Sequence, residues 1–181
     1  MAQAGDHLQT VAKVVQGLRG LGFEPVLVGG MALVVLGSRR VTRDFDFVVA
    51  QPGDRLALVV GVFYDRGLEL VSRLDEAGNV TATIDNHRVA AIRLRADAPA
   101  SAYFFDVTTG LRIDLLFDFP LPAAELAKHA TRITIRKRAL LVASDEHLLH
   151  LKKTAAAARS VQGDADDIAF LESRKRRRTL P

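Results

Sequence analysis

The stretch VLVGGMALVVLGSRRVTRDFDFVV, residues 26–49, constrains the fold more than any other part of the sequence. An apolar run ends at Gly29-Gly30, and a second apolar run covers residues 31–36. After a basic segment, a third apolar run at residues 44–49 carries Asp44 and Asp46. In a β-strand, residues two apart point to the same face, with alpha carbons about 6.6 Å apart. Asp44 and Asp46 therefore share one face of a strand, and the phenylalanines that alternate with them point to the other face and enter the core.

A second apolar strand, Leu111–Phe117, carries Asp114 in its middle. If the two strands are neighbours, three carboxylates meet at one place, where each pair of like charges costs roughly 3 kcal/mol at a separation near 5 Å. Asp106 or Asp118 could replace Asp114, although Asp118 suits a turn better. Such a cluster requires cations, and carboxylate oxygens suit Mg²⁺, two ions of which stabilise phosphoryl or nucleotidyl transfer.

The glycine pair points to a phosphate ligand. Gly29 and Gly30 at a strand-to-helix turn permit close approach to the backbone, and the helix that follows favours anions. Arg39, Arg40 and Arg43 lie next to this turn in the sequence and can pair with phosphate oxygens. The stretch therefore predicts a triphosphate site beside the carboxylates.

The remaining sequence predicts an α/β (α+β) fold, with a mixed β-sheet flanked by helices and further helices at the C-terminal end. Asp85-Asn86 and residues 108–110 are expected to form hairpin turns, and Ser144 is expected to cap a helix. The expected helices span about 7–21, 31–36, 52–65, 122–130, 144–159 and 164–173. The expected strands span 25–28, 45–49, 68–74, 80–84, 88–94, 103–108 and 111–117, with a strand pair at 133–142.

Length and composition indicate one domain. The chain has 181 residues and no cysteine, which excludes disulfides and thiolate metal sites. No apolar run reaches the roughly 18 residues of a membrane span, and the first residues lack the order of a secretory signal, so a cytoplasmic protein without membrane contact is expected. We assign residues 1–173 to one domain, helical from about 144, and residues 174–181 to a flexible basic tail.

The tail carries the positive charge of the chain. Arg174 to Arg178 contribute five positive charges, more than the whole net charge of +4. A solvated, disordered end is the commoner explanation for such a run, and an arm that binds RNA is the alternative.

The motifs resemble those of a known superfamily. Gly29-Gly30 followed by Asp44-Phe45-Asp46-Phe47 is similar to the signature of polymerase-β-like nucleotidyltransferases. Arg40-Val-Thr42-Arg-Asp44-Phe-Asp46 resembles the R-x-T-x-D-x-D form of abortive-infection toxins of the AbiEii/AbiGii type and their small relatives. The segment from His147 to Lys152, then Arg159, then Asp164 to Asp167, is similar to the helical lysine, arginine and aspartate motifs of that group.

This resemblance covers roughly residues 20–172 and implies an enzyme that moves a nucleoside monophosphate from an NTP to a hydroxyl acceptor. The acceptor could be a tRNA 3′ end, and the enzyme could be the toxin of a toxin–antitoxin or phage-defence pair with a cognate antitoxin. The resemblance implies two Mg²⁺ ions, with Mn²⁺ as an alternative. The metal and catalytic residues would be Asp44, Asp46 and Asp114, and the nucleotide would contact Gly29, Gly30, Arg40, Thr42, Lys152 and Asp164, or Asp167 in place of Asp164.

The sequence leaves two alternatives to an active toxin-like nucleotidyltransferase. One is a catalytically weak module of the same fold that binds a nucleotide or a partner, since Gly30 stands where many active members have serine. The other is a transferase that acts on a small molecule or a protein. His147 and His150 could meet on one helix face, but no third metal ligand is evident near them.

Overall fold

The computed structural model of the protein describes residues 4–158 and 162–179. In this part of the chain, an eight-stranded mixed sheet has the order β4-β3-β5-β6-β2-β1-β8-β7. The predicted fold class is confirmed. None of the described helices is long and apolar enough to cross a membrane.

The strands are β1 (Val26–Val28), β2 (Asp44–Val49), β3 (Glu69–Leu74), β4 (Val80–Ile84), β5 (Ser101–Phe105), β6 (Arg112–Phe117), β7 (Thr131–Ile135) and β8 (Arg138–Val142). The helices are α1 (Ala4–Gly20), α2 (Gly29–Val35), α3 (Leu56–Tyr64), α4 (His87–Asp97), α5 (Ala123–His129), α6 (Asp145–Ala158) and α7 (Gln162–Thr179). A 3-10 turn, Gly53–Arg55, precedes α3.

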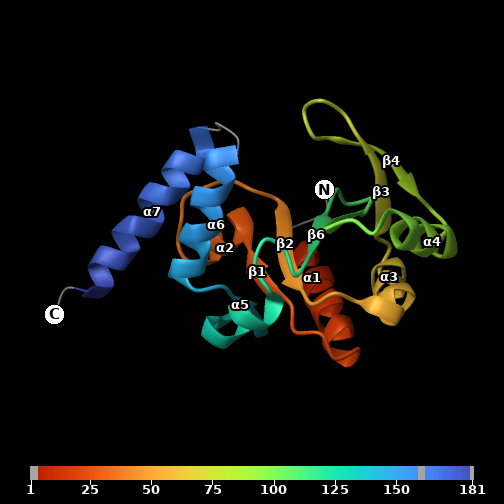
Figure 1. Ribbon diagram of the computed structural model, residues 1–181, viewed down its shortest axis with the longest axis horizontal. Helices are drawn as coiled ribbons and strands as arrows, with labels where there is room; N and C mark the ends of the chain where they lie inside the picture. Colours follow the sequence, from red (N-terminus) through yellow and green to blue (C-terminus); the bar gives the residue numbers. More distant parts are fainter. Residues whose placement is uncertain (1–3, 159–161, 180–181) are drawn as a thin grey trace.

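The centre of the sheet is formed by strands that are far apart in the sequence. β2 pairs in parallel with β6 and antiparallel with β1, and β1 pairs in parallel with β8. In Figure 1, α6 and α7 lie on one side of these central strands, and the β3–β4 hairpin and α4 lie on the other. The middle of the sheet, where β2 and β6 run, lies between these two parts.

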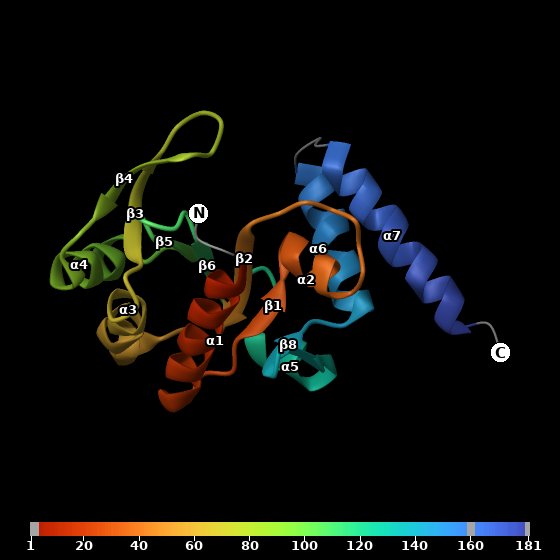
Figure 2. The ribbon, with the colours of Figure 1, turned by 180° about the vertical axis from the view of Figure 1, so that it is seen from behind.

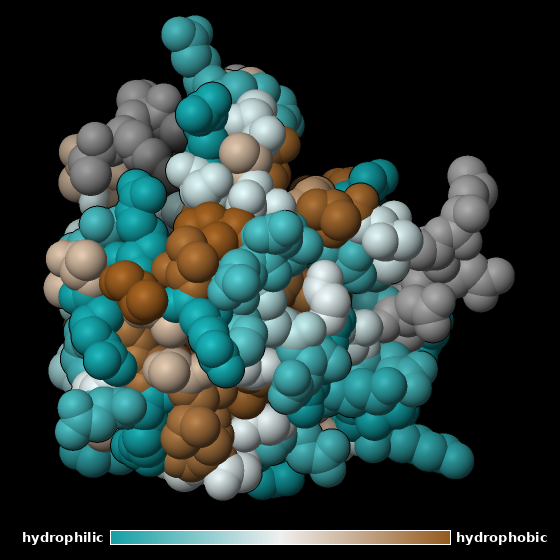
Figure 3. Space-filling model, turned by 90° about the vertical axis from the view of Figure 1, so that its right-hand side faces the viewer, coloured by the Kyte–Doolittle hydropathy of each residue, from teal (hydrophilic) through white to brown (hydrophobic). Residues whose placement is uncertain are grey.

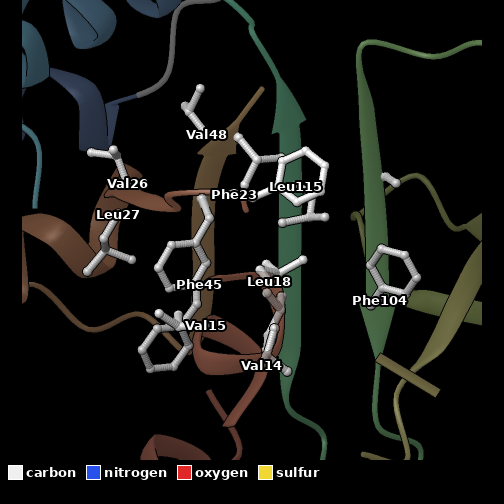
Figure 4. Packing of buried hydrophobic residues seen from close by; sticks show 14 of the residues in the cluster. Val14, Val15, Leu18, Phe23, Val26, Leu27, Phe45, Val48, Phe104 and Leu115 are labelled. Carbon is white, nitrogen blue, oxygen red and sulfur yellow. The ribbon is translucent and has the colours of Figure 1, made fainter. Parts of the chain in front are cut away.

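One face of the central strands forms the main core. Helix α1, seen in front of the sheet in Figure 2, has apolar residues at helical spacing. Val14, Val15 and Leu18 point from α1 toward the strands that carry Phe45 and Leu115, and all five are buried (Figure 4). The alternation along β2 therefore works as the sequence predicts, with the phenylalanines packed in the core.

The surface at the α3 and α4 end is mixed in character. Leu58 of α3 and Val89 and Ile92 of α4 are more than half exposed. Seen from this side, apolar patches alternate with hydrophilic side chains (Figure 3). Scattered exposed apolar residues of this kind are ordinary on protein surfaces.

Two predicted elements were wrong. Residues 88–94, expected as a strand after a hairpin turn, form helix α4, because the Asn86 side chain accepts hydrogen bonds from the backbone N–H groups of Arg88 and Val89 and caps the helix. The last helix, expected to end at Ser173 before a flexible tail, continues through the basic segment to Thr179. Arg159 of the lysine–arginine–aspartate motif lies outside the described residues.

Candidate active site

The parallel pairing of β2 and β6 brings the predicted carboxylates together. Asp46 lies directly opposite Asp114, and Asp44 lies opposite Arg112. Directly opposed residues of neighbouring strands share a face, so all three carboxylates lie on the face away from the core. Asp114 is buried at 7 % exposure, and Asp44 and Asp46 are half-buried.

The two alternatives to Asp114 are used elsewhere. Asp106 accepts hydrogen bonds from the backbone N–H groups of Thr108 and Thr109 and organises the turn before β6. Asp118 accepts from the backbone N–H groups of Gln51 and Ala123 at the end of β6. Both carboxylates stabilise loops by accepting hydrogen bonds from backbone N–H groups. Asp114 is therefore the third carboxylate beside Asp44 and Asp46.

The electrostatics show crowded negative charge. Burial, followed by the nearby charges of Asp114 and Asp44, raises the pKa of Asp46 to about 7, against the opposing effects of Arg112 and Lys152. Burial also raises the pKa of Asp114 to about 6, with Arg112 opposing this rise and Asp44 adding to it. Ionising both groups is therefore costly, and a bound cation would relieve that cost.

Arg112 is a member of this site that the sequence analysis missed. Its Nε and Nη2 atoms donate to the two carboxylate oxygens of Asp114 at 2.8 and 2.9 Å. Its guanidinium also lies 4.6 Å from the centre of the Tyr103 ring and donates to the Gly78 carbonyl at 3.4 Å. The signal was the Arg-x-Asp spacing in β6, which places both side chains on one face of the strand.

The structure also tests whether this site suits a divalent metal. Asp44 and Asp46 form no ion pair with any residue that the structure describes, whereas Asp114 is held by Arg112. Among the described residues, no three acidic or histidine side chains are arranged to hold a metal ion. The donor chemistry of the cluster and the raised pKa values of Asp46 and Asp114 fit Mg²⁺. Each oxygen of Asp114 accepts one hydrogen bond from Arg112 and keeps a second lone pair, so Asp114 can contribute an oxygen while Arg112 holds it.

The glycine pair lies against the site. Gly29 has a φ of 68°, and a Cβ atom there would lie 2.1 Å from Oδ2 of Asp46. A Cβ atom at Gly30 would lie 2.7 Å from Nε of Arg40. Helix α2 begins at Gly29, two positions earlier than predicted, so the turn and the first helical residues pack directly on β2.

We expect Gly29→Ala to lower the free energy of unfolding by about 1–3 kcal/mol, because alanine resists the positive φ and its methyl group collides with Asp46. Gly61→Ala is the matched control. Gly61 lies inside α3 with open space at its Cβ position, so alanine there should stabilise the chain by up to about 1 kcal/mol. Urea unfolding of both variants checks this, and a Gly29→Ala variant as stable as wild type would contradict it.

A charge network joins the C-terminal helices to the segment that precedes β2. Lys152 of α6 lies 2.7 Å from Asp167 and 3.3 Å from Asp164, both on α7, and Arg40 also pairs with Asp167. Asp164 and Asp167 are 4 % and 3 % exposed. Both aspartates that the sequence could not separate therefore belong to one network, and Asp167 alone also binds Arg40.

The predicted phosphate-binding residues fall into two groups. Lys152 lies close enough to Asp46 to lower its pKa, and Arg40 lies against Gly30, so both belong to this side of the sheet. Thr42 instead lines a cavity with Arg43 and Phe45, on the core side of β2. The structure thus brings Arg40 and Lys152 to the glycine and carboxylate cluster but does not bring Thr42 there.

Comparison with known proteins identifies the fold. No protein-family model and no curated protein matches the sequence. The solution structure of the antibiotic-resistance factor ANT(2″)-Ia matches with a TM-score of 0.59 and 12% identity, over 93% of this chain and 84% of that one. The lincosamide antibiotic adenylyltransferase LnuA, bound to lincomycin, matches with a TM-score of 0.57 and 13% identity, over 91% and 96% of the two chains.

The chain has the nucleotidyltransferase fold. An antigenic nucleotidyltransferase-like protein from Paracoccidioides brasiliensis shares this fold with a TM-score of 0.57 and 17% identity, over 92% of this chain and 75% of that one. The structural similarity establishes the nucleotidyltransferase fold, and at sequence identities this low it carries over neither a substrate nor the resemblance to abortive-infection toxins. The nucleotidyltransferase fold predicted from the Gly-Gly and Asp-x-Asp motifs is confirmed.

Proposed function

We propose that this protein transfers a nucleoside monophosphate from an NTP to an acceptor hydroxyl group. The acceptor oxygen would bond to the α-phosphorus, the bond from that phosphorus to the bridging oxygen would break, and pyrophosphate would leave. One observation carries the proposal: in a nucleotidyltransferase fold, neighbouring strands β2 and β6 hold Asp44, Asp46 and Asp114 on one face. Fold alone does not determine function, so the proposal rests on these side chains.

Asp44 and Asp46 would hold Mg²⁺, or Mn²⁺ in its place, together with an oxygen of Asp114. When bound, the ions would supply positive charge to the phosphoryl group under transfer. Asp114 would accept the proton of the acceptor hydroxyl, and Arg112 would position this carboxylate and favour its ionised form. The proposed reaction would thus depend on two metal ions.

The nucleotide would lie across the glycine turn. Gly29 and Gly30 carry no side chain that would block a phosphate from the backbone, and Arg40 and Lys152 lie beside them. The aspartate network holds both cations in fixed positions, which lowers the entropy lost when they bind phosphate. Asp164 and Asp167 would thus act through the positions of Arg40 and Lys152.

A labelling experiment tests the proposed function. The protein would be incubated with each NTP labelled at the α-phosphate, with Mg²⁺ or Mn²⁺, and with total cell RNA or a cell lysate. Label in RNA, in protein or in a small molecule identifies the acceptor class, and a γ-phosphate label should not be transferred. No transfer of α-label with any NTP would contradict the enzyme and leave the binding module of the same fold.

We infer RNA as the acceptor class, because α7 presents a basic surface. Lys175, Arg176 and Arg177 are exposed on this helix, which leads away from the sheet (Figure 1). Two residues of this segment also pair within the chain: Arg174 pairs with Asp145 and donates to the Leu36 carbonyl, and Lys175 pairs with Glu146. Removing the whole basic segment would therefore disturb packing as well as charge.

The sharper test replaces Arg176 and Arg177 with glutamine and leaves Arg174 in place. We expect this variant to bind a tRNA pool more weakly and to bind NTP as wild type does. The slope of log affinity for RNA against log salt concentration should be smaller in magnitude by about 0.7–0.9 for each RNA phosphate that the variant no longer binds. Arg88→Gln with Arg95→Gln, exposed on α4 at the other end of the molecule, is the control with an equal change in charge. Parallel salt slopes for wild type and the α7 variant would contradict an RNA-binding role for α7.

The toxin assignment rests on the Arg40-to-Asp46 motif. It is supported if expression of the wild-type chain arrests growth and if a co-expressed partner protein relieves that arrest.

A further inference from the structure

A cavity of about 800 Å³ opens on the core side of β2, the face opposite to the carboxylates. Its walls come from α1, α2, β2, the end of β7 and the loop before β6 that contains Thr109 and Gly110. Its apolar lining consists of Leu8, Met31, Val34, Val35, Phe45 and Ile135. This volume lies in the range of small-molecule sites, which are mostly apolar with a few placed polar groups. Phe45 alternates with Asp44 and Asp46 along β2, so the cavity that it lines lies on the opposite face of this strand from the carboxylates.

Two arginines from separate segments line the same cavity. Arg43 lies just before β2, and Arg136 lies in the turn between β7 and β8. Neither arginine forms a salt bridge or a side-chain hydrogen bond with the part of the chain that the structure describes. Both arginines are exposed, and two guanidinium groups without a partner among the described residues favour a ligand that carries negative charge.

The turn that presents Arg136 is costly for its sequence. Ile135 pairs with Arg138, so Arg136 and Lys137 alone form the turn, with φ values of 47° and 67°. Turns of this geometry strongly favour Asn-Gly, because other residues resist positive φ. Arg136 and Lys137 do not stabilise this turn, because both adopt a positive φ that long side chains disfavour. The turn does, however, place Arg136 on the cavity, which is consistent with a role in binding a ligand.

We propose that this cavity binds a small molecule with an apolar body and one anionic group. The apolar body would pack on Phe45 and on the α2 side chains Met31, Val34 and Val35. The anionic group, a carboxylate or a phosphate monoester, would lie between Arg43 and Arg136. The ligand would thus occupy the core side of the strand whose other face carries Asp44 and Asp46.

Calorimetry on the full chain tests this proposal with three probes of equal chain length, namely decanoate, decyl phosphate and decanol, each below its micelle concentration. We expect saturable binding of at least one anionic probe at least about tenfold tighter than decanol, and the stronger of the two identifies carboxylate or phosphate as the anion. Arg43→Gln with Arg136→Gln should weaken that binding by about tenfold. Arg132→Gln with Arg138→Gln, exposed on the same hairpin but not lining the cavity, should change it by less than about twofold.

A second variant separates ligand binding from folding. Arg136→Asn with Lys137→Gly supplies the favoured turn residues, so it should raise the melting temperature by about 2–4 °C while weakening the anionic probe. Chemical-shift mapping should place the probe at the α2 and β2 residues of the cavity. The proposal is overturned if neither anionic probe saturates, if decanol binds as tightly, or if both arginine variants bind the anionic probe as wild type does.

Discussion

Replacing Asp44 and Asp46 together with asparagine should lower nucleotidyl transfer by at least about 10³-fold, since it removes the charges that would hold the metal ions against the phosphoryl group. The same change should leave the fold intact and raise the free energy of unfolding in the absence of metal. Burial and two neighbouring carboxylates raise the pKa of Asp46 to about 7, so its charge opposes folding at neutral pH.

The rate would be measured with α-labelled NTP and the acceptor class found by the labelling experiment. Asp54→Asn with Asp65→Asn is the matched control, because both residues are exposed and the change in charge is the same. This control should keep transfer within about twofold of wild type. Wild-type transfer by the Asp44 and Asp46 variant would show that the carboxylates of β2 are not catalytic.

The second large effect is a loss of stability as pH rises. Asp46 and Asp114 have pKa values of about 7 and about 6 in the folded chain, against an ordinary value of 3.8. Folding therefore favours their protonated forms, and the stabilisation is complete below pH 3.8 and is lost as pH rises through 6 and 7. In EDTA, the free energy of unfolding should fall between pH 5 and pH 8 by an amount on the order of 3 kcal/mol through these two groups.

Urea unfolding at several pH values measures this fall, and Asp46→Asn isolates the contribution of Asp46 from other titrating groups. The fall should be smaller in the variant, and Mg²⁺ should restore stability to the wild type at pH 8 more than to the variant. The groups that set the effect are Asp44 and Asp114, which add negative charge, and Arg112 and Lys152, which offset it. Parallel pH profiles for the two proteins would contradict the crowding of charge at this site.

The sequence predicted the site best where local pattern determines geometry. The alternation of Asp44 and Asp46 with phenylalanines fixes the two faces of β2, and one further assumption, that β2 and β6 are neighbours, brought in Asp114. β6 alternates in the same way, and Arg112 lies two positions before Asp114 on the same face of that strand. The bidentate contact between Arg112 and Asp114 depends on side-chain positions that spacing does not specify.

Of the other errors, one concerns a local helix cap, and the rest concern packing between segments that are far apart in the sequence. Residues 88–94 contain only two β-branched residues, and their alanine, arginine and leucine residues favour a helix. The Asn86 cap and the burial of Ala90, Ala91 and Leu94 on one side stabilise that helix. Thr42 lies two residues before Asp44, yet it lines the cavity on the other side of β2. The network of Arg40, Lys152, Asp164 and Asp167 depends on the packing of α7 against α6, which sequence periodicity does not reveal.

The order of strands in the sheet has a consequence for how the chain reaches its fold. The two parallel pairings at the centre join β2 to β6 and β1 to β8, so each closes a long loop, and topologies of this kind fold slowly. Until β8 has been synthesised, the short buried strand β1 has one edge without a partner. An unpaired edge flanked by apolar residues is the kind of surface on which chains aggregate, so truncated or stalled chains that end before residue 138 should aggregate more readily than the full chain and depend on a chaperone.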